Sequence, residues 1–168
     1  MFYDLLKETA RRDGIAIHGR EYYQTLFEDN WYDGKTPDIR LYLAEHGGDV
    51  LAGIVTLFRG REAVYLYGAS SEKKRNLMAP YALQLKAMED AKASGCEEYD
   101  LFGIPPDDDP SHPMAGLYRF KTGFGGRIVH RPGSWDYPSR PLVYRLFSAA
   151  EILRKKARTI KKQAARHS

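Results

Sequence analysis

Residues 39–68 read IRLYLAEHGGDVLAGIVTLFRGREAVYLYG, and their hydrophobic pattern predicts three antiparallel strands. Residues 39–44 alternate with a period of two, which is typical of a half-exposed strand. Residues 50–58 are apolar on both faces and predict a buried middle strand, in which Gly53 indicates a bulge. Residues 63–68 predict the third strand, and short glycine-containing turns join the three.

The pattern changes to helical spacing on either side of this meander. Helices are expected at residues 2–12, 21–29, 76–94 and 114–122 and from Pro141 onward, with further strands at 97–102 and 127–131. Their predicted buried stripes are Phe2, Leu5, Leu6 and Thr9; Met78, Tyr81, Leu85 and Met88; and Leu142, Leu146, Ala150 and Leu153. The predicted class is α+β, with a mixed, mostly antiparallel sheet flanked by helices. This order of elements is that of the acyl-CoA N-acyltransferase (GNAT)-like fold.

Composition narrows the class of protein. A length of 168 residues with 43% hydrophobic residues suits one domain with a real core. No run of about 18 uncharged apolar residues predicts a membrane span. The charged N-terminus is unlike a signal peptide, so a cytoplasmic location is expected. Cys96 is the only cysteine and the five histidines are widely spaced, so neither a disulfide nor a metal site is expected.

The positive charge is concentrated at the C-terminal end. Residues 154–168 contain seven Lys and Arg and no acid, which leaves residues 1–153 with a net charge of −3 out of the overall +4. We expect one domain over residues 1–150 and a basic helical tail over 151–168. Such a tail binds phosphate polyanions, either RNA or an anionic inner membrane face, or it is simply a solvated helix end.

A possible anion site follows the third strand. Alternation predicts that Tyr65 and Tyr67 share one face of that strand. The small-residue turn at 68–71 and the basic run at 73–75 then precede a helix N-terminus, a combination that suits an anion. The alternative is an ordinary connection between strand and helix. Acyl-CoA-dependent acetyltransferases carry a glycine-containing pyrophosphate loop here, whereas residues 73–79 contain no glycine, so coenzyme A is not expected as a cofactor.

Lys121 is the charged side chain that the spacing of the 114–122 helix singles out. Met114, Leu117, Tyr118 and Lys121 lie at helical spacing, so an ammonium group ends an otherwise apolar face. The Lys121 ammonium either takes part in catalysis or has a structural role. In the structural role, its aliphatic stem covers the apolar surface, or its charge complements the helix dipole in the last turn before Gly123.

Four strings, in this order, carry a resemblance to a known family: FYDLLKETARRDG, YLYGASSEKKRNLMAPYALQ, YDLFGI and GLYRFKTGFGG, which span residues 2–126. They resemble the Fem (FemABX) family of peptidoglycan aminoacyltransferases, and the likeness extends to about residue 147. The resemblance implies an acetyltransferase-type fold and transfer of an aminoacyl group from aminoacyl-tRNA. The implied acceptor is the stem-peptide amine of a peptidoglycan precursor, either lipid-linked or UDP-linked.

The resemblance also implies roles for individual residues. Lys121 matches the lysine that the family uses near the transferring carbonyl, and Phe120 matches its aromatic neighbour. The positions assigned to substrate binding are Tyr65, Tyr67, Arg75, Tyr81, Tyr118 and Arg119. No histidine or carboxylate pair is an evident general base, so proton transfer assisted by the substrate is expected.

The chain departs from the family in two respects. Family members usually have two such domains in tandem, and this chain matches only the second, so a second GNAT-like domain or a homo-oligomer is expected to complete the acceptor pocket. Residues 130–136 also differ from the usual ending. Two alternatives remain open: an acyltransferase of this fold with another acyl donor, and a non-catalytic half that binds RNA or a cell-wall precursor. A peripheral location at the inner membrane face would follow from a lipid-linked acceptor.

Overall fold

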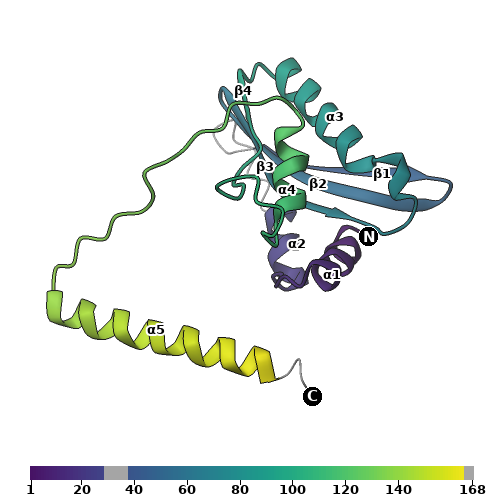
Figure 1. The fold of residues 1–168 in the computed structure, drawn as a ribbon. Coiled ribbons are helices and arrows are strands. Elements are labelled where there is room, and N and C mark those ends of the chain that lie inside the picture. Colours follow the sequence, from purple (N-terminus) through teal and green to yellow (C-terminus); the bar gives the residue numbers. More distant parts are fainter. Residues whose placement is uncertain (29–37, 165–168) are drawn as a thin grey trace. The chain divides into compact units, whose positions relative to one another are not determined.

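The computed structural model describes residues 1–28 and 38–164, which form two compact units, Met1–Gly126 and Arg127–Ser168. Among the described residues of the first unit, one sheet has the strand order β1-β2-β3-β4 (Figure 1). Its strands are β1 (Asp38–His46), β2 (Asp49–Arg59), β3 (Glu62–Ser70) and β4 (Glu98–Asp100). The first three pair antiparallel and β4 pairs parallel to β3, which confirms the predicted mixed, mostly antiparallel α+β sheet.

Helices cover both faces of this sheet. The helical elements of the first unit are α1 (Phe2–Asp13), α2 (Arg20–Glu28), the 3₁₀ turn η1 (Arg75–Leu77), α3 (Ala79–Ala93) and α4 (Ala115–Thr122). Figure 1 shows α3 on one side of the sheet and α1 and α2 on the other. The helix predicted at 21–29 ends within the described residues at Glu28, and position 29 lies outside them.

The core beneath α1 follows the predicted stripe. Phe2, Leu5 and Leu6 pack with Tyr23, Val55 and Ala69, and Thr9 is buried with them. The bulge predicted in this strand occurs at Leu51, which has no partner on β1, and not at Gly53, which lies under this helix in regular register. Its lack of a side chain has another reason, because a Cβ there would lie 2.7 Å from Cδ2 of Phe2.

The core beneath α3 differs from the predicted stripe. The buried residues are Leu83, Gln84, Ala87 and Ala91, whereas Leu85 is 55% and Met78 is 53% exposed. Alanines on this face let the helix lie close to the sheet. The prediction had chosen the face with the larger apolar side chains, which is the wrong one. The helix also begins at Ala79 and not at Asn76, because Met78 adopts φ 51° and Pro80 occupies the first turn.

A β-bulge at Leu66 decides where the two tyrosines of β3 point. Tyr67 pairs with Val55 and Tyr65 with Thr56, so Leu66 is an extra residue without a partner on β2. Tyr65 therefore packs in the α3 layer and Tyr67 in the α1 layer. The predicted shared face is wrong, because one inserted residue reverses the alternation.

β3 and β4 separate after three paired residues. The register runs from Glu62 opposite Glu98 to Val64 opposite Asp100. β4 ends there, short of the predicted range 97–102, while β3 continues to Ser70. The outer edge of β3 beyond Val64 therefore has no strand partner among the described residues.

The second unit contains α5 (Pro141–Ala164), which begins where the sequence predicts. Residues 127–131 form no strand, contrary to the prediction, and their side chains are exposed. The compact first unit ends at Gly126, before the expected boundary at residue 150. No helix within the described part of the chain is long and apolar enough to cross a membrane.

Candidate active site

A cavity of about 800 Å³ opens in the first unit beside the unpaired edge of β3. Its walls come from α1, β3, the start of α3, the loop after β4, and α4. The two layers of the domain both contribute, since Leu6 and Tyr67 line it from one face of the sheet and Ile54 and Tyr65 from the other. The separation of β3 from β4 thus creates the opening.

Lys121, on the last turn of α4, lines this cavity and is only 6% exposed. Its Nζ donates a hydrogen bond to the carbonyl oxygen of Gly103 at 2.9 Å and lies 5.3 Å from the centre of the Tyr65 ring. Burial lowers the pKa of Lys121 to about 8, and the nearby Asp100 carboxylate opposes that shift. The group therefore remains mostly protonated at neutral pH.

The ammonium of Lys121 has unused hydrogen-bonding capacity. A lysine carries three N–H donors, and the Gly103 carbonyl is its one hydrogen-bond acceptor among residues 1–28 and 38–164. Because a buried donor without an acceptor is costly, the remaining donors favour an oxygen atom of a bound molecule. The arrangement suits stabilisation of developing negative charge.

Tyr65 and Tyr67 border the cavity in different environments. The hydroxyl of Tyr65 lies over Gly68, and burial raises the pKa of Tyr65 to about 12. The hydroxyl of Tyr67 lies 2.9 Å from that of Tyr22, and burial together with this neighbour raises the pKa of Tyr67 to about 12. Both phenols are neutral at physiological pH and act as hydrogen-bonding groups.

Phe120 and Tyr81 lie together at the junction of α4 and α3. Their ring centroids are 4.8 Å apart, and Phe124 completes the cluster at 5.4 Å from Phe120. Tyr81 and Phe120 line the cavity, whereas Tyr118 and Arg119 are not among the residues that form its wall. The structure thus brings together Lys121, Phe120, Tyr65, Tyr67, Tyr81 and Arg75 at one cavity.

The basic run is only partly available to a ligand. Lys73 and Lys74 pair with the Asp49 carboxylate at 2.6 and 3.0 Å. Arg75 is exposed, lines the cavity and forms no ion pair with any residue that the structure describes. Of the three cations, Arg75 is therefore the one whose charge is not already balanced by a partner.

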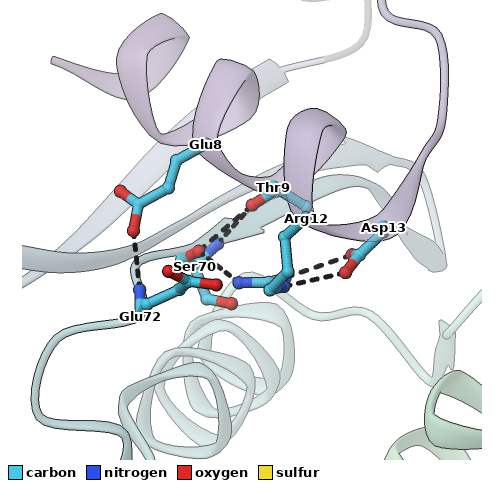
Figure 2. A network of polar contacts seen from close by, with 6 residues as sticks. All are labelled: Glu8, Thr9, Arg12, Asp13, Ser70 and Glu72. Atoms are coloured by element: carbon cyan, nitrogen blue, oxygen red, sulfur yellow. Dashed lines mark hydrogen bonds and ion pairs between the residues drawn. The ribbon is translucent and has the colours of Figure 1, made fainter.

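The amide groups of the turn after β3 are bonded within the protein (Figure 2). Glu8 on α1 accepts from the Glu72 amide at 2.7 Å and from the Ser71 hydroxyl at 3.0 Å. Thr9 Oγ1 accepts from the Ser70 amide at 3.0 Å, and Arg12 donates to the Ser70 carbonyl at 2.9 Å.

Two further bonds complete this set. The amide of Ser71 donates to Leu51 and that of Lys73 to the Ser71 hydroxyl. The amides of residues 70–73 are thus occupied, and a carboxylate already lies where the sequence predicted an anion.

Several residues of this site carried no clear signal in the sequence. Glu8, Thr9 and Arg12 belong to a helix whose pattern indicated only its buried stripe. Phe102, which lines the cavity and is 62% exposed, adopts φ 65°, and the Asp100 side chain caps its amide at 2.7 Å. An Asp two residues before a bend is a recognisable signal for such a turn. No group of three or more potential metal-binding side chains occurs among the described residues.

The sequence model of the FemAB family matches residues 38–152, which is more than half of the chain. The chain belongs to the FemAB family. The matched range contains the open edge of β3, the Asp100 turn, α4 and Lys121.

Two curated relatives of this FemAB-family chain share one name, lipid II:glycine glycyltransferase. A lipid II:glycine glycyltransferase of Staphylococcus saprophyticus is 32% identical over 99 residues, which are 59% of this chain and 24% of that protein. The protein of the same name from Staphylococcus aureus strain USA300 is 32% identical over 110 residues, 65% of this chain and 26% of that protein. The chain therefore spans about a quarter of the length of these relatives.

Solved structures place the FemAB chain in the predicted fold. The crystal structure of FemX superposes with a TM-score of 0.75 at 22% identity and covers 86% of this chain and 52% of FemX. An aminoglycoside acetyltransferase from a soil metagenome superposes with a TM-score of 0.57 at 13% identity, covering 83% of this chain and 88% of its own. The GNAT-like fold is thereby confirmed.

Proposed function

We propose that this chain is the acyl-transferring half of an aminoacyltransferase that adds an aminoacyl group to the stem peptide of a peptidoglycan precursor, in formation of the interpeptide bridge. The donor is aminoacyl-tRNA and the acceptor is a primary amine of the stem peptide. The observation that carries the proposal is Lys121, a buried ammonium with N–H donors to spare at the wall of a cavity of about 800 Å³. The name of the curated relatives, lipid II:glycine glycyltransferase, supports the substrate class.

The reaction is aminolysis of an activated ester. The amine nitrogen bonds to the aminoacyl carbonyl carbon, and the carbonyl oxygen takes on negative charge. Lys121 donates to that oxygen, and one such donor contributes about 3 kcal/mol. The bond between carbon and the ribose oxygen then breaks, and a proton from the amine passes to the ribose oxygen, so the step needs no separate protein base.

The cavity suits this donor better than it suits an acyl-CoA. The amides of residues 70–73 bond to the protein itself, and Glu8 places a carboxylate at the turn. A diphosphate at that turn would lack these donors and would meet a like charge. Arg75 at the cavity wall, by contrast, is available to a phosphate of the acceptor end of a tRNA.

The pocket for the acceptor includes residues from outside the cavity described above. Because the chain spans about a quarter of its curated relatives and about half of FemX, we propose that a second GNAT-like domain or a second copy contributes to binding the lipid-linked or UDP-linked precursor. The basic segment 154–168 adds a phosphate-binding element, either for tRNA or for the anionic inner face of the membrane on which a lipid-linked acceptor lies.

A transfer assay tests the proposal. The full chain is incubated with a mixed pool of charged tRNA and with lipid II, a UDP-linked precursor or a simple primary amine as acceptor. The simple amine reports the chemistry at Lys121 even when the acceptor pocket is incomplete. Lys121→Met should lower the rate about 100-fold.

The matched control is Lys86→Met, which removes an exposed lysine of α3 that pairs with Asp90. This variant should retain the wild-type rate. Unchanged transfer by Lys121→Met would contradict the role of Lys121, and absence of transfer by the wild type with every acceptor would contradict the proposed function.

A further inference from the structure

The loop between β4 and α4 begins with a turn that the Asp100 side chain holds. Asp100 is the last residue of β4, and its backbone pairs with Val64. Its Oδ1 accepts a hydrogen bond from the Phe102 amide at 2.7 Å. Phe102 has φ 65°, a left-handed conformation that a large side chain adopts only when its surroundings hold it. Asp100 supplies that constraint.

This turn sets the direction of the next carbonyl group. The carbonyl oxygen of Gly103 accepts the hydrogen bond from Lys121 at 2.9 Å. Gly103 follows Phe102 directly, so the left-handed turn at Phe102 sets the direction in which the chain enters Gly103 and thereby contributes to the orientation of that oxygen. Two hydrogen bonds in series, Asp100 to Phe102 and Gly103 to Lys121, thus connect the end of β4 to the ammonium on α4.

Asp100 also affects Lys121 through its charge. The titratable groups that face the Lys121 ammonium are Asp100 at the end of β4 and Tyr65 on β3, with Tyr99 next to Tyr65. The phenols are neutral at physiological pH, since the pKa of each is raised to about 12. Asp100 is therefore the negative charge that favours the protonated form of Lys121.

We propose that Asp100 is the positioning residue of the transfer site, holding the Gly103 carbonyl for Lys121 by its hydrogen bond to the Phe102 amide. The charge of the same carboxylate also favours the protonated form of Lys121. This inference rests on the proposed function only for the effect of Asp100 on the rate of transfer. The titration of Lys121 follows from the structure of the chain alone.

Two substitutions separate the hydrogen bond from the charge. Asp100→Asn keeps an oxygen that can accept from the Phe102 amide and removes the charge. Asp100→Ala removes both. Asp107→Asn is the matched control, because Asp107 is an exposed aspartate of the same loop.

The first measurement is the titration of Lys121 in the full-length chain, followed by NMR of lysine labelled with ¹³C at Cε. The Lys121 signal is the one that Lys121→Met lacks. Asp100→Asn should lower its titration midpoint by about one pH unit, the size typical of losing a neighbouring opposite charge. Asp107→Asn should leave it unchanged. An unchanged midpoint in Asp100→Asn would overturn the electrostatic half of the proposal.

The second measurement is the pH profile of transfer to a simple amine. The alkaline limb of the profile should move down by about one pH unit in Asp100→Asn. Well below that limb, Asp100→Asn should keep kcat within about twofold, whereas Asp100→Ala should lose about tenfold because the carbonyl is no longer held. Equal kcat in all three proteins would overturn the geometric half. Absence of transfer by the wild type contradicts the proposed function instead, and the NMR titration still decides the electrostatic role.

Discussion

The side chain of Tyr65 occupies the space that Gly68 leaves free: a Cβ on Gly68 would collide with the Tyr65 hydroxyl. The same ring lies 5.3 Å from the Lys121 Nζ. Gly68 therefore fixes the position of an aromatic ring that contacts the ammonium of the site.

Gly68→Ala should lower the free energy of unfolding by about 1–3 kcal/mol, because the Tyr65 hydroxyl must move within a packed layer. Tyr65→Phe removes that hydroxyl but keeps the ring carbon Cζ, which a Cβ on Gly68 would approach to 2.8 Å, so the double variant should recover part of the loss. Urea denaturation of the four proteins gives the coupling energy directly. Gly19→Ala is the control, since a Cβ there meets no atom within 4 Å. Additive losses in the double variant would show that the two residues are independent.

The pH dependence of stability should report the buried Lys121. Its pKa is lowered to about 8 in the folded chain from an ordinary value of 10.5, so between these pH values the unfolded chain binds more protons and stability rises with pH. Relative to Lys121→Met, the wild type should gain on the order of 2–3 kcal/mol between pH 7 and pH 11. Denaturation curves of both proteins at each pH measure the difference, and a constant difference would contradict a buried ammonium.

The carboxylate of Glu8 should stabilise the turn after β3. Glu8→Ala leaves the Glu72 amide and the Ser71 hydroxyl without their acceptor, at a cost of about 1–3 kcal/mol. The bond to the Glu72 amide lowers the pKa of Glu8, so its contribution is present above the ordinary value of 4.5 and is lost as pH falls through the lowered pKa.

Thermal unfolding in the presence of added formate provides a second measurement of the same site. Formate should raise the Tm of Glu8→Ala, by filling the position of the carboxylate, more than that of the wild type. Glu89→Ala, an exposed glutamate of α3, is the control. Equal effects of formate on all three proteins would show that the turn has no vacant acceptor position.

The basic segment should determine how tRNA binding depends on salt. Residues 154–168 contain seven Lys and Arg, and each lost phosphate contact reduces the slope of log K against log salt by roughly one. Deletion of the segment should therefore flatten that slope in a filter-binding or anisotropy titration. An unchanged slope would mean that the segment does not contact RNA, and vesicles containing anionic lipid then test the membrane as its ligand.

The regular parts of the first unit were predictable from the sequence because their patterns are local. The stripe Phe2, Leu5, Leu6 and Thr9 is buried as expected, and the hydrophobic pattern over residues 39–68 corresponds to three paired strands. Lys121 was a candidate site residue through the family resemblance, and in the structure its side chain is buried at a cavity.

The features that the sequence did not predict depend on contacts between distant segments of the chain. An inserted residue such as Leu66 has no signature of its own, yet it places Tyr65 and Tyr67 on opposite faces. The bonds from Glu8 to the turn after β3 join residues about 60 positions apart. In α3, alanines face the sheet, whereas the prediction assigned the buried stripe to the larger apolar residues.

The bulge at Leu66 couples the two hydrophobic layers of the domain at the cavity. Tyr65 and Tyr67 leave one strand in opposite directions and still border one opening, so a molecule held there touches both hydrophobic layers at once. Repacking under α1 moves Tyr67 and repacking under α3 moves Tyr65, so either change alters the wall of the same cavity. Substitutions far from Lys121 in either layer should therefore alter what the cavity accepts, although they touch neither the lysine nor its ligand.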